Sequence, residues 1–306
     1  MKRLPKSRLL RFVVLPLIAV VGLLLLYGCA AEVLVWNTDR ITPRDPETGV
    51  MIGAEARTLG PEEAAGAVLF VHGHIGAGDN FADLPEKAAA AGWRVRVMRL
   101  AGHGTSPRDY ARTTKGQLLD SVRAEAQALR DQGYGEVVLI GHSMGGALST
   151  LAAAEGDVDR LVLAAPYFGV THKWWYGLRP ETWAKVLAPF VWWVPKIDFF
   201  VQVNRREAVD EITSYYWAPV RTLAMIPEIA AEASARETTA RVDVPVLWLH
   251  APGDNAADFD TARRTVEAFA SDDVTSVTLP RSNHLIFHDF DRAMVEEAVL
   301  EFLGTP

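Results

Sequence analysis

The sequence has little cysteine and no excess of positive charge outside its first residues. Its 306 residues include a single cysteine, Cys29, so no internal disulfide bond can form, even in an oxidising compartment. The formal net charge is -7. The basic residues at the amino terminus (Lys2, Arg3, Lys6, Arg8 and Arg11) contribute the opposite sign, so the rest of the chain is more acidic still. Because phosphate binding needs clustered Lys and Arg, this charge argues against a nucleic-acid partner.

Long apolar runs are also absent, apart from one near the amino terminus. Residues 12–31 carry no charge, follow the basic cluster and lead into Glu32. Such a run is typical of a signal sequence or an N-terminal membrane anchor, and we assign residues 1–31 to it. Because the positive flank stays inside, the globular part is expected outside the cytoplasmic membrane and close to its surface.

Cys29 lies at the end of this run, in "LLLLYGCAAE". The stretch resembles a bacterial lipobox, in which a small residue precedes a cysteine that becomes the lipidated first residue of the mature protein. Tyr27 departs from the small residue that is usual at its position. The alternative is an uncleaved spanning helix in which Cys29 is an apolar filler, and the sequence leaves both interpretations open.

The remaining chain shows alternating strand-like and helical patterns. Residues 32–49 are polar and rich in Pro and Gly, which predicts a tether. Short apolar runs then predict strands at 67–71, 95–100, 137–140, 161–165, 244–250 and 274–279. Helical spacing predicts helices at 80–91, 114–132, 145–155, 258–270 and 289–303. This alternation predicts an α/β fold over residues 50–166 and 242–306, with a mostly parallel sheet covered by helices on both faces.

Residues 167–241 interrupt the alternation with an aromatic-rich segment that has no strand-like run flanked by turns. An insertion of this kind predicts a helical cap over the sheet edge. Its tryptophan pairs exceed what a small cap can bury, and tryptophan is favoured at bilayer interfaces. We therefore predict an acyl-chain pocket lined by Trp174, Trp175, Trp192 and Trp193. The alternative is that these rings pack the cap onto the sheet domain.

The stretch "LIGHSMGGAL" places Ser143 between a predicted strand and a predicted helix. A sharp turn at such a junction lifts the serine hydroxyl above the sheet, and the small residues around it avoid clashes with neighbouring backbone. The pattern G-x-S-x-G alone is weak evidence, but this context predicts that Ser143 is a nucleophile.

A nucleophilic serine needs a histidine to accept its proton and an acid to orient that histidine. Asp254 and His284 follow later strands in the order Ser, Asp, His that such sheets require. Asp258 is a rival acid that we expect to cap a helix instead. His288 is a rival base that we expect to be a hydrogen-bonded surface residue.

The loop "VHGHIG" after the first predicted strand is a candidate oxyanion hole. Its His72-Gly73 pair allows a tight turn, so the backbone N–H of His74 can point at the carbonyl under attack. The N–H of Met144 would be the second donor. The alternative is an ordinary glycine-rich loop.

These motifs together resemble those of α/β-hydrolases. Over residues 50–304 the chain is similar to the monoacylglycerol lipase and lysophospholipase branch, which shares a profile with serine aminopeptidase-like sequences. The resemblance rests on "VHGHIG", "LAGHGTSP", "GHSMGG", "LHAPGDN" and "SNHLIFHD". It implies Ser143 as nucleophile, His284 as base and then acid, and Asp254 as its orienter. The acid loop departs most from the family, with Ala251 in place of a usual glycine.

The sequence therefore predicts a membrane-tethered serine hydrolase that cleaves amphiphilic carboxylic esters through an acyl-enzyme, with no metal or cofactor implied. An aminopeptidase or amidase is the alternative, and it would need an acid in the cap to bind a substrate ammonium. The candidates for that acid are Glu181, Asp198, Glu207, Asp210 and Glu211. A catalytically idle binding module is a further alternative, and the oligomeric state stays open.

Overall fold

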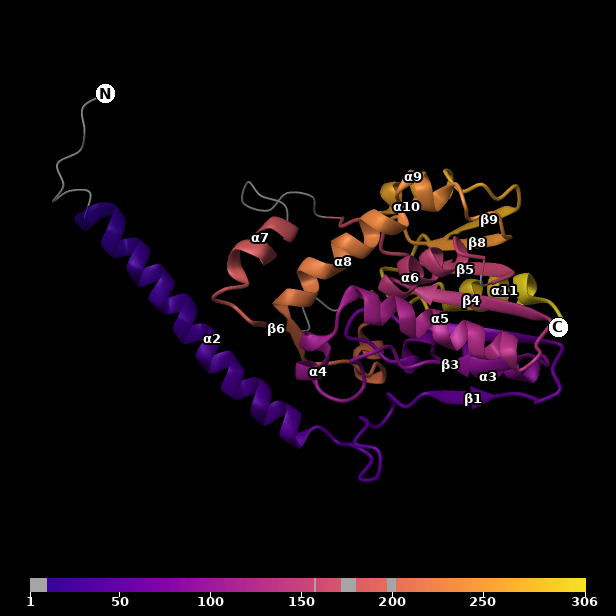
Figure 1. Ribbon diagram of the computed structural model, residues 1–306, viewed down its shortest axis with the longest axis horizontal. Helices are drawn as coiled ribbons and strands as arrows, with labels where there is room; N and C mark the ends of the chain where they lie inside the picture. The colour runs from indigo at the N-terminus through magenta and orange to yellow at the C-terminus, as the bar shows by residue number, and fades with distance from the viewer. Residues whose placement is uncertain (1–9, 157, 172–179, 197–201) are drawn as a thin grey trace.

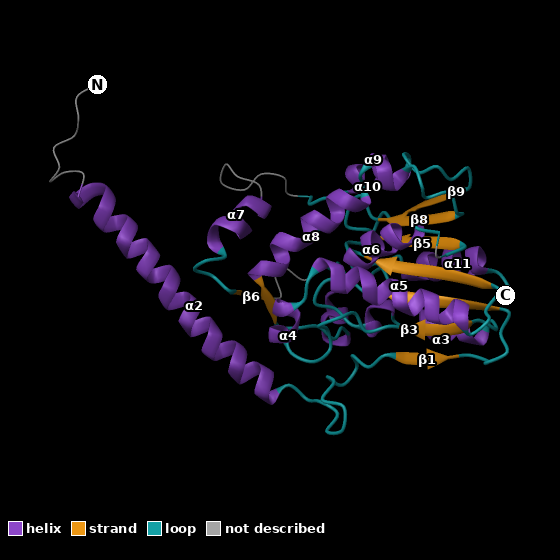
Figure 2. Ribbon diagram, in the orientation of Figure 1, coloured by secondary structure: helices purple, strands orange, loops and turns teal. Residues whose placement is uncertain are grey.

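The computed structural model describes residues 10–156, 158–171, 180–196 and 202–306. A seven-stranded sheet with the order β1-β3-β2-β4-β5-β8-β9 forms its centre (Figures 1 and 2). The strands are β1 (Arg57–Leu59), β2 (Gly66–Val71), β3 (Arg94–Val97), β4 (Glu136–His142), β5 (Arg160–Ala164), β8 (Val246–His250) and β9 (Val274–Thr278). Every neighbouring pair is parallel except β1 and β3. The predicted α/β fold is confirmed.

Strand β1 is the one strand of this sheet that the sequence pattern did not predict. It has three residues at the sheet edge and pairs antiparallel with β3, with Thr58 opposite Arg96. Its side chains are at least partly exposed, so it carries no apolar run for a pattern search to detect.

Helices cover both faces of the sheet. One face packs against α5 (Lys115–Asp131), α6 (Met144–Ala153) and α10 (Phe259–Val266), and the other against α3 (Leu84–Ala90) and α11 (Arg292–Leu303). The cap helix α8 (Val220–Ala233) packs onto α6. Successive strand residues alternate between the two cores, as Val68 and Leu69 do on β2. Both are fully buried, which explains why these strands read as continuous apolar runs.

The cap contains α7 (Pro180–Leu187), α8 and α9 (Arg236–Thr239), with the 3-10 turn η4 (Arg206–Glu211). It also contains a two-stranded antiparallel sheet of β6 (Trp193–Pro195) and β7 (Trp217–Pro219), which corrects the expectation of a segment without strands. Each strand has three residues and includes a proline, so neither resembles a strand in sequence.

The N-terminal helix α2 (Leu15–Ile41) follows a π-helical turn, η1 (Leu10–Val14), and lies to one side of the sheet domain (Figure 1). Residues 11–41 are long and apolar enough to cross a membrane, and this criterion rests on length and composition alone. The helix continues ten residues past the predicted anchor, into the stretch predicted to be a polar tether. Ala31 and Val35 explain this difference, because they are buried against Trp193 and Trp217 of the cap.

Hydrogen bonds also join the second half of α2 to the domain. The Tyr27 hydroxyl donates to the Trp193 carbonyl oxygen at 3.0 Å, and the Trp193 indole donates to Glu32 at 2.5 Å. The Ser106 hydroxyl, at the start of α4 (Pro107–Arg112), donates to Asp39 at 2.8 Å. This half of the helix is therefore part of the folded domain, whereas apolar side chains of the first half, such as Leu23, are exposed.

Candidate active site

The predicted site residues lie where the sheet topology reverses direction. From β2 the chain moves to β3 on one side, and from β4 it moves to β5 on the other. Crevices at the carboxyl ends of strands beside such a switch point are the usual ligand sites of open α/β sheets. The loop with His74 follows β2, and Ser143 follows β4 directly.

Ser143 occupies a strained turn between β4 and α6. Its backbone has φ 55° and ψ -121°, a conformation that side-chain-bearing residues rarely adopt. The Ser143 N–H donates to the Ala164 carbonyl oxygen, which holds the turn against β5. A Cβ atom at Gly145 would lie 2.0 Å from the Val71 carbonyl oxygen, so only glycine allows α6 to approach β2 this closely. The predicted turn at Ser143 is therefore present.

Ser143, His284 and Asp254 form one hydrogen-bonded chain. The Ser143 Oγ lies 2.8 Å from His284 Nε2, and His284 Nδ1 lies 2.7 Å from Asp254 Oδ2. All three residues are buried. Burial alone would raise the pKa of the Asp254 carboxyl, but the charge of His284 and hydrogen bonds from His250 and His284 outweigh it and lower that pKa. The carboxylate is thus ionised and holds the histidine with Nε2 directed at the serine.

Asp254 is fixed by its own loop. Its Oδ1 accepts hydrogen bonds from the backbone N–H groups of Ala256 and Ala257, at 2.8 and 2.9 Å. Its Oδ2 lies 3.2 Å from His250 Nε2, at the end of β8. The rival Asp258 caps α10 instead, as expected, because its Oδ1 accepts the Thr261 N–H at 3.0 Å.

His288, the rival base, is not a surface residue and in this respect the expectation was wrong. Its side chain is buried, its Nε2 lies 2.8 Å from the Asp79 carbonyl oxygen, and its Nδ1 lies 3.6 Å from Glu211. These contacts fasten the 3-10 turn η2 (Gly78–Phe81) and η4 to the segment before α11. They do not bring His288 to Ser143.

His142 is a supporting residue that the sequence analysis missed. Its Nε2 donates to the His284 carbonyl oxygen at 3.0 Å, so it positions the loop that carries His284. Burial, with a smaller contribution from the charge of His284, lowers the pKa of His142 to about 3. The ring therefore stays neutral and does not compete for the serine proton. The only sequence signal was its place directly before Ser143.

The two predicted oxyanion donors lie on either side of Ser143: His74 is in the loop after β2, and Met144 is the first residue of α6. Within the described chain, the backbone N–H groups of His74 and Met144 have no hydrogen-bond acceptor. The buried His72 shapes the first loop, since its Nδ1 donates to the Gly73 carbonyl oxygen and its Nε2 accepts the Leu100 N–H at 3.2 Å. Burial lowers the pKa of His72 to about 4, which keeps this ring neutral. These two N–H donors, one on each segment, can stabilise the oxyanion that develops when Ser143 attacks a carbonyl group.

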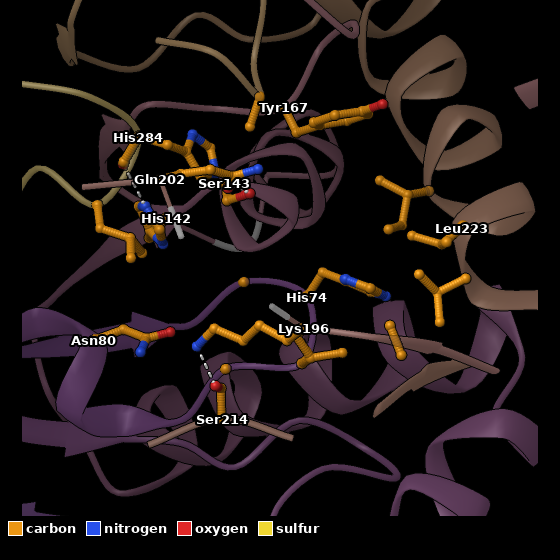
Figure 3. A pocket seen from close by; sticks show the side chains of 18 of the residues that line it. His74, Asn80, His142, Ser143, Tyr167, Lys196, Gln202, Ser214, Leu223 and His284 are labelled. Carbon is orange, nitrogen blue, oxygen red and sulfur yellow. Dashed lines mark hydrogen bonds between the residues drawn. The ribbon is translucent and has the colours of Figure 1, made fainter. Parts of the chain in front are cut away.

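A cavity of about 480 Å³ opens over Ser143 and His284 and is covered by the cap (Figure 3). Its apolar walls come from the chain after β5, from α7 and β6, and from α8: Tyr167, Val170, Ala184, Val194, Leu223 and Ile226. Lys196, Asn80 and Ser214 also reach it. The sequence did not predict that these residues line a cavity, because they are distant along the chain and come together only in the folded structure.

The predicted tryptophan lining needs correction. Trp193 is buried against α2 with its indole bonded to Glu32, and Trp192 is 42% exposed. Neither residue lines the cavity. Both lie beside α2 instead, since a Cβ atom at Gly28 would be 3.9 Å from the Trp192 ring. Trp174 and Trp175 lie outside the described residues.

No set of three His, Cys, Asp or Glu side chains could hold a metal ion in the part of the chain that the structure describes. The site instead offers a serine hydroxyl, a histidine oriented by a carboxylate, and two backbone donors. On this sheet, these features define a serine hydrolase of the α/β-hydrolase fold.

Comparison with known proteins assigns the family. A family model described as "Serine aminopeptidase, S33" matches residues 62–291, and the chain belongs to this family. A thermostable monoacylglycerol lipase from Bacillus sp. (strain H-257) is 27% identical over 270 residues, covering 83% of this chain and 96% of the relative.

Solved structures show the same fold. A structure of metagenome-derived lipolytic enzymes (LipS and LipT) superposes with a TM-score of 0.73 at 24% identity, covering 83% of this chain and 98% of that one. The monoacylglycerol lipase of Paleococcus ferrophilus superposes with a TM-score of 0.69 at 22% identity, covering 81% and 97%.

Proposed function

We propose that this protein is a membrane-tethered lipase that hydrolyses amphiphilic esters of the monoacylglycerol or lysophospholipid type. The chain is a carboxylic ester hydrolase, and the finer assignment concerns its substrate and its place at the membrane. The observation that carries the proposal is the hydrogen-bonded chain of Ser143, His284 and Asp254 at the floor of a mainly apolar cavity.

The mechanism follows from the donors and acceptors in place. His284 Nε2 takes the proton of Ser143 Oγ as that oxygen attacks the ester carbonyl carbon. The N–H groups of His74 and Met144 stabilise the oxyanion of the tetrahedral intermediate. The imidazolium then donates its proton to the leaving alcohol, and water attacks the acyl-enzyme by the same route in reverse.

The cavity walls support an acyl chain as the bound group. Tyr167, Leu223 and Ile226 give an apolar surface beside the serine, and apolar burial favours each methylene group by about 0.8 kcal/mol. The cap that carries part of this surface packs against α2, so an anchored helix would hold the cavity close to the lipid surface. Lipid esters could then enter with little exposure to water.

The family description also raises an aminopeptidase as a second candidate. An aminopeptidase needs an acid that faces the substrate ammonium. No carboxylate is among the residues known to line the cavity, and Glu207, Asp210 and Glu211 are exposed outside it. The side chains of Glu181 and Asp198 lie outside the described residues. The positive charge of Lys196 in the lining would repel a substrate ammonium group, which favours an ester hydrolase over an aminopeptidase.

A catalytically idle binding module is the alternative from another class, and it would not need Ser143 to be reactive.

Hydrolysis of 4-nitrophenyl esters with acyl chains of two to sixteen carbons tests both alternatives. The full chain is assayed in detergent beside Ser143→Ala, and both proteins are treated with a fluorophosphonate label. We expect a preference for medium or long chains, labelling of the wild type and no turnover or labelling of the variant. Labelling without ester turnover, but with turnover of aminoacyl amides, would support the aminopeptidase instead.

A further inference from the structure

Polar side chains gather at one end of the cavity. Figure 3 shows Lys196, Ser214 and Asn80 on one side of it, with Tyr167 on the opposite side. They come from three segments that are far apart in sequence: Lys196 follows β6, Ser214 precedes β7, and Asn80 lies in η2. The mechanism described above uses none of them.

The ammonium group of Lys196 is held in place by the cap sheet. Its backbone N–H donates to the Tyr216 carbonyl oxygen at 2.6 Å, and its Nζ donates to Ser214 Oγ at 2.5 Å. The neighbouring Tyr215 N–H donates to the Ile75 carbonyl oxygen at 3.0 Å, which attaches this segment to the loop after β2. The charge is therefore directed into the cavity by fixed backbone, close to the candidate oxyanion loop.

Asn80 adds an independent indication of a ligand. Its side chain is only 4% exposed and lines the cavity, yet its Nδ2 has no hydrogen-bond partner in the described chain. Buried amide donors are nearly always paired in folded proteins. A buried donor without a partner, on a side chain that lines a cavity, marks a place where a ligand can supply the acceptor.

The charge balance at this end favours an anionic ligand. At this end the described lining holds the Lys196 ammonium group, the Asn80 amide and the Ser214 hydroxyl, and no carboxylate is among the described lining residues. Asp79, the acidic neighbour of Asn80, does not line the cavity, and its Oδ2 instead accepts the Thr213 N–H at 2.7 Å. Charge-assisted hydrogen bonds from Lys to phosphate are about twice as strong as neutral ones.

We propose that Lys196 and Asn80 form a subsite for a phosphate group on the leaving alcohol, which makes acyl glycerophosphates the preferred substrates of this enzyme. The inference rests on the proposed function, because Ser143 must cleave the ester in the same cavity. The acyl chain lies against the wall formed by Tyr167 and Leu223, and the phosphate lies at the opposite, polar end. Attack then occurs at the carbonyl between them.

The test compares two esters that differ only in the phosphate, 1-lauroylglycerol and 1-lauroylglycerol 3-phosphate, with the full chain in neutral detergent. The wild type should have the higher kcat/KM for the phosphate ester. Lys196→Gln should lower the ratio of the two kcat/KM values by about 10-fold to 100-fold, the usual loss for a charge-assisted hydrogen bond. Lys196→Arg should keep much of the ratio, and Asn80→Asp should lower it by adding a negative charge.

Lys185→Gln is the matched control, because Lys185 is an exposed cap lysine beside Glu228 that does not line the cavity. It should leave the ratio at the wild-type value. The subsite is refuted if the neutral ester is preferred, or if Lys196→Gln and Lys185→Gln have the same ratio. Failure of the wild type on both esters, without fluorophosphonate labelling, would instead refute the proposed function itself.

Discussion

Replacement of Asp254 by asparagine tests which carboxylate orients His284. In the structure, Asp254 Oδ1 accepts two backbone N–H groups, and its Oδ2 faces the nitrogens of His284 and His250. An asparagine that keeps the two backbone bonds must place its NH₂ group where Oδ2 was. Two donors then face each other, and His284 must move its proton from Nδ1 to Nε2 to restore a hydrogen bond.

A histidine with its proton on Nε2 cannot accept the proton of Ser143. The loss for this wrong tautomer is about 10⁴-fold in kcat, which corresponds to roughly 5 kcal/mol of transition-state stabilisation. Asp258→Asn is the control, because it makes the same change in size and charge at the rival acid. Because asparagine and aspartate cap helices about equally well, it should change kcat by less than about 2-fold.

The assay is turnover of a 4-nitrophenyl ester by the wild type and both variants, with circular dichroism to verify that each variant is folded. The reasoning would be refuted if folded Asp254→Asn kept more than about a tenth of the wild-type kcat. It would also be refuted if Asp258→Asn were the inactive variant, which would make Asp258 the orienting acid.

Three further predictions follow from burial and close packing. Lowering the pH from 7.5 to 5.5 should reduce the free energy of unfolding by about 1.4 kcal/mol for each of His72 and His142, whose folded pKa values are about 4 and about 3. The unfolded chain binds these protons below pH 6.5 and the folded chain does not. If urea titration gave the same free energy of unfolding at both pH values, the two rings would not be neutral and buried as the structure shows. Gly73→Ala should lower kcat at least 10-fold, because its Cβ would lie 2.9 Å from Ser143 Cβ, and an unchanged kcat in the ester assay would exclude this close approach. Removal of residues 1–41 should lower the melting temperature more than removal of residues 1–14, because only the longer deletion exposes Trp193 and Trp217. Equal melting temperatures in the same detergent would mean that α2 does not stabilise the cap.

Much of the catalytic arrangement was predictable from the chain alone, and its residues carry local signals. Small residues around Ser143 indicate a tight turn, and the apolar runs before Asp254 and His284 predict strands that end shortly before these residues. The order of these elements along the chain then places all three at the same sheet edge. The roles of these residues remain a proposal for the experiments above.

The cap could not be predicted in the same way. Its strands β6 and β7 are three residues long and are stabilised by pairing with each other and by contact with α2, which are long-range interactions. The same contacts turn Trp193 away from the cavity, where aromatic content alone had placed it. His288 was misjudged for a similar reason, because its partners Asp79 and Glu211 are distant in sequence.

The sequence by itself thus determined the α/β fold and the three residues of the candidate catalytic chain, because hydrophobic periodicity and turn chemistry are local properties of the polypeptide. The tertiary structure decided which side chains line the cavity. Lys196, Asn80 and Ser214 have no common sequence pattern, and they meet only because the cap folds back over the carboxyl ends of β2 and β4.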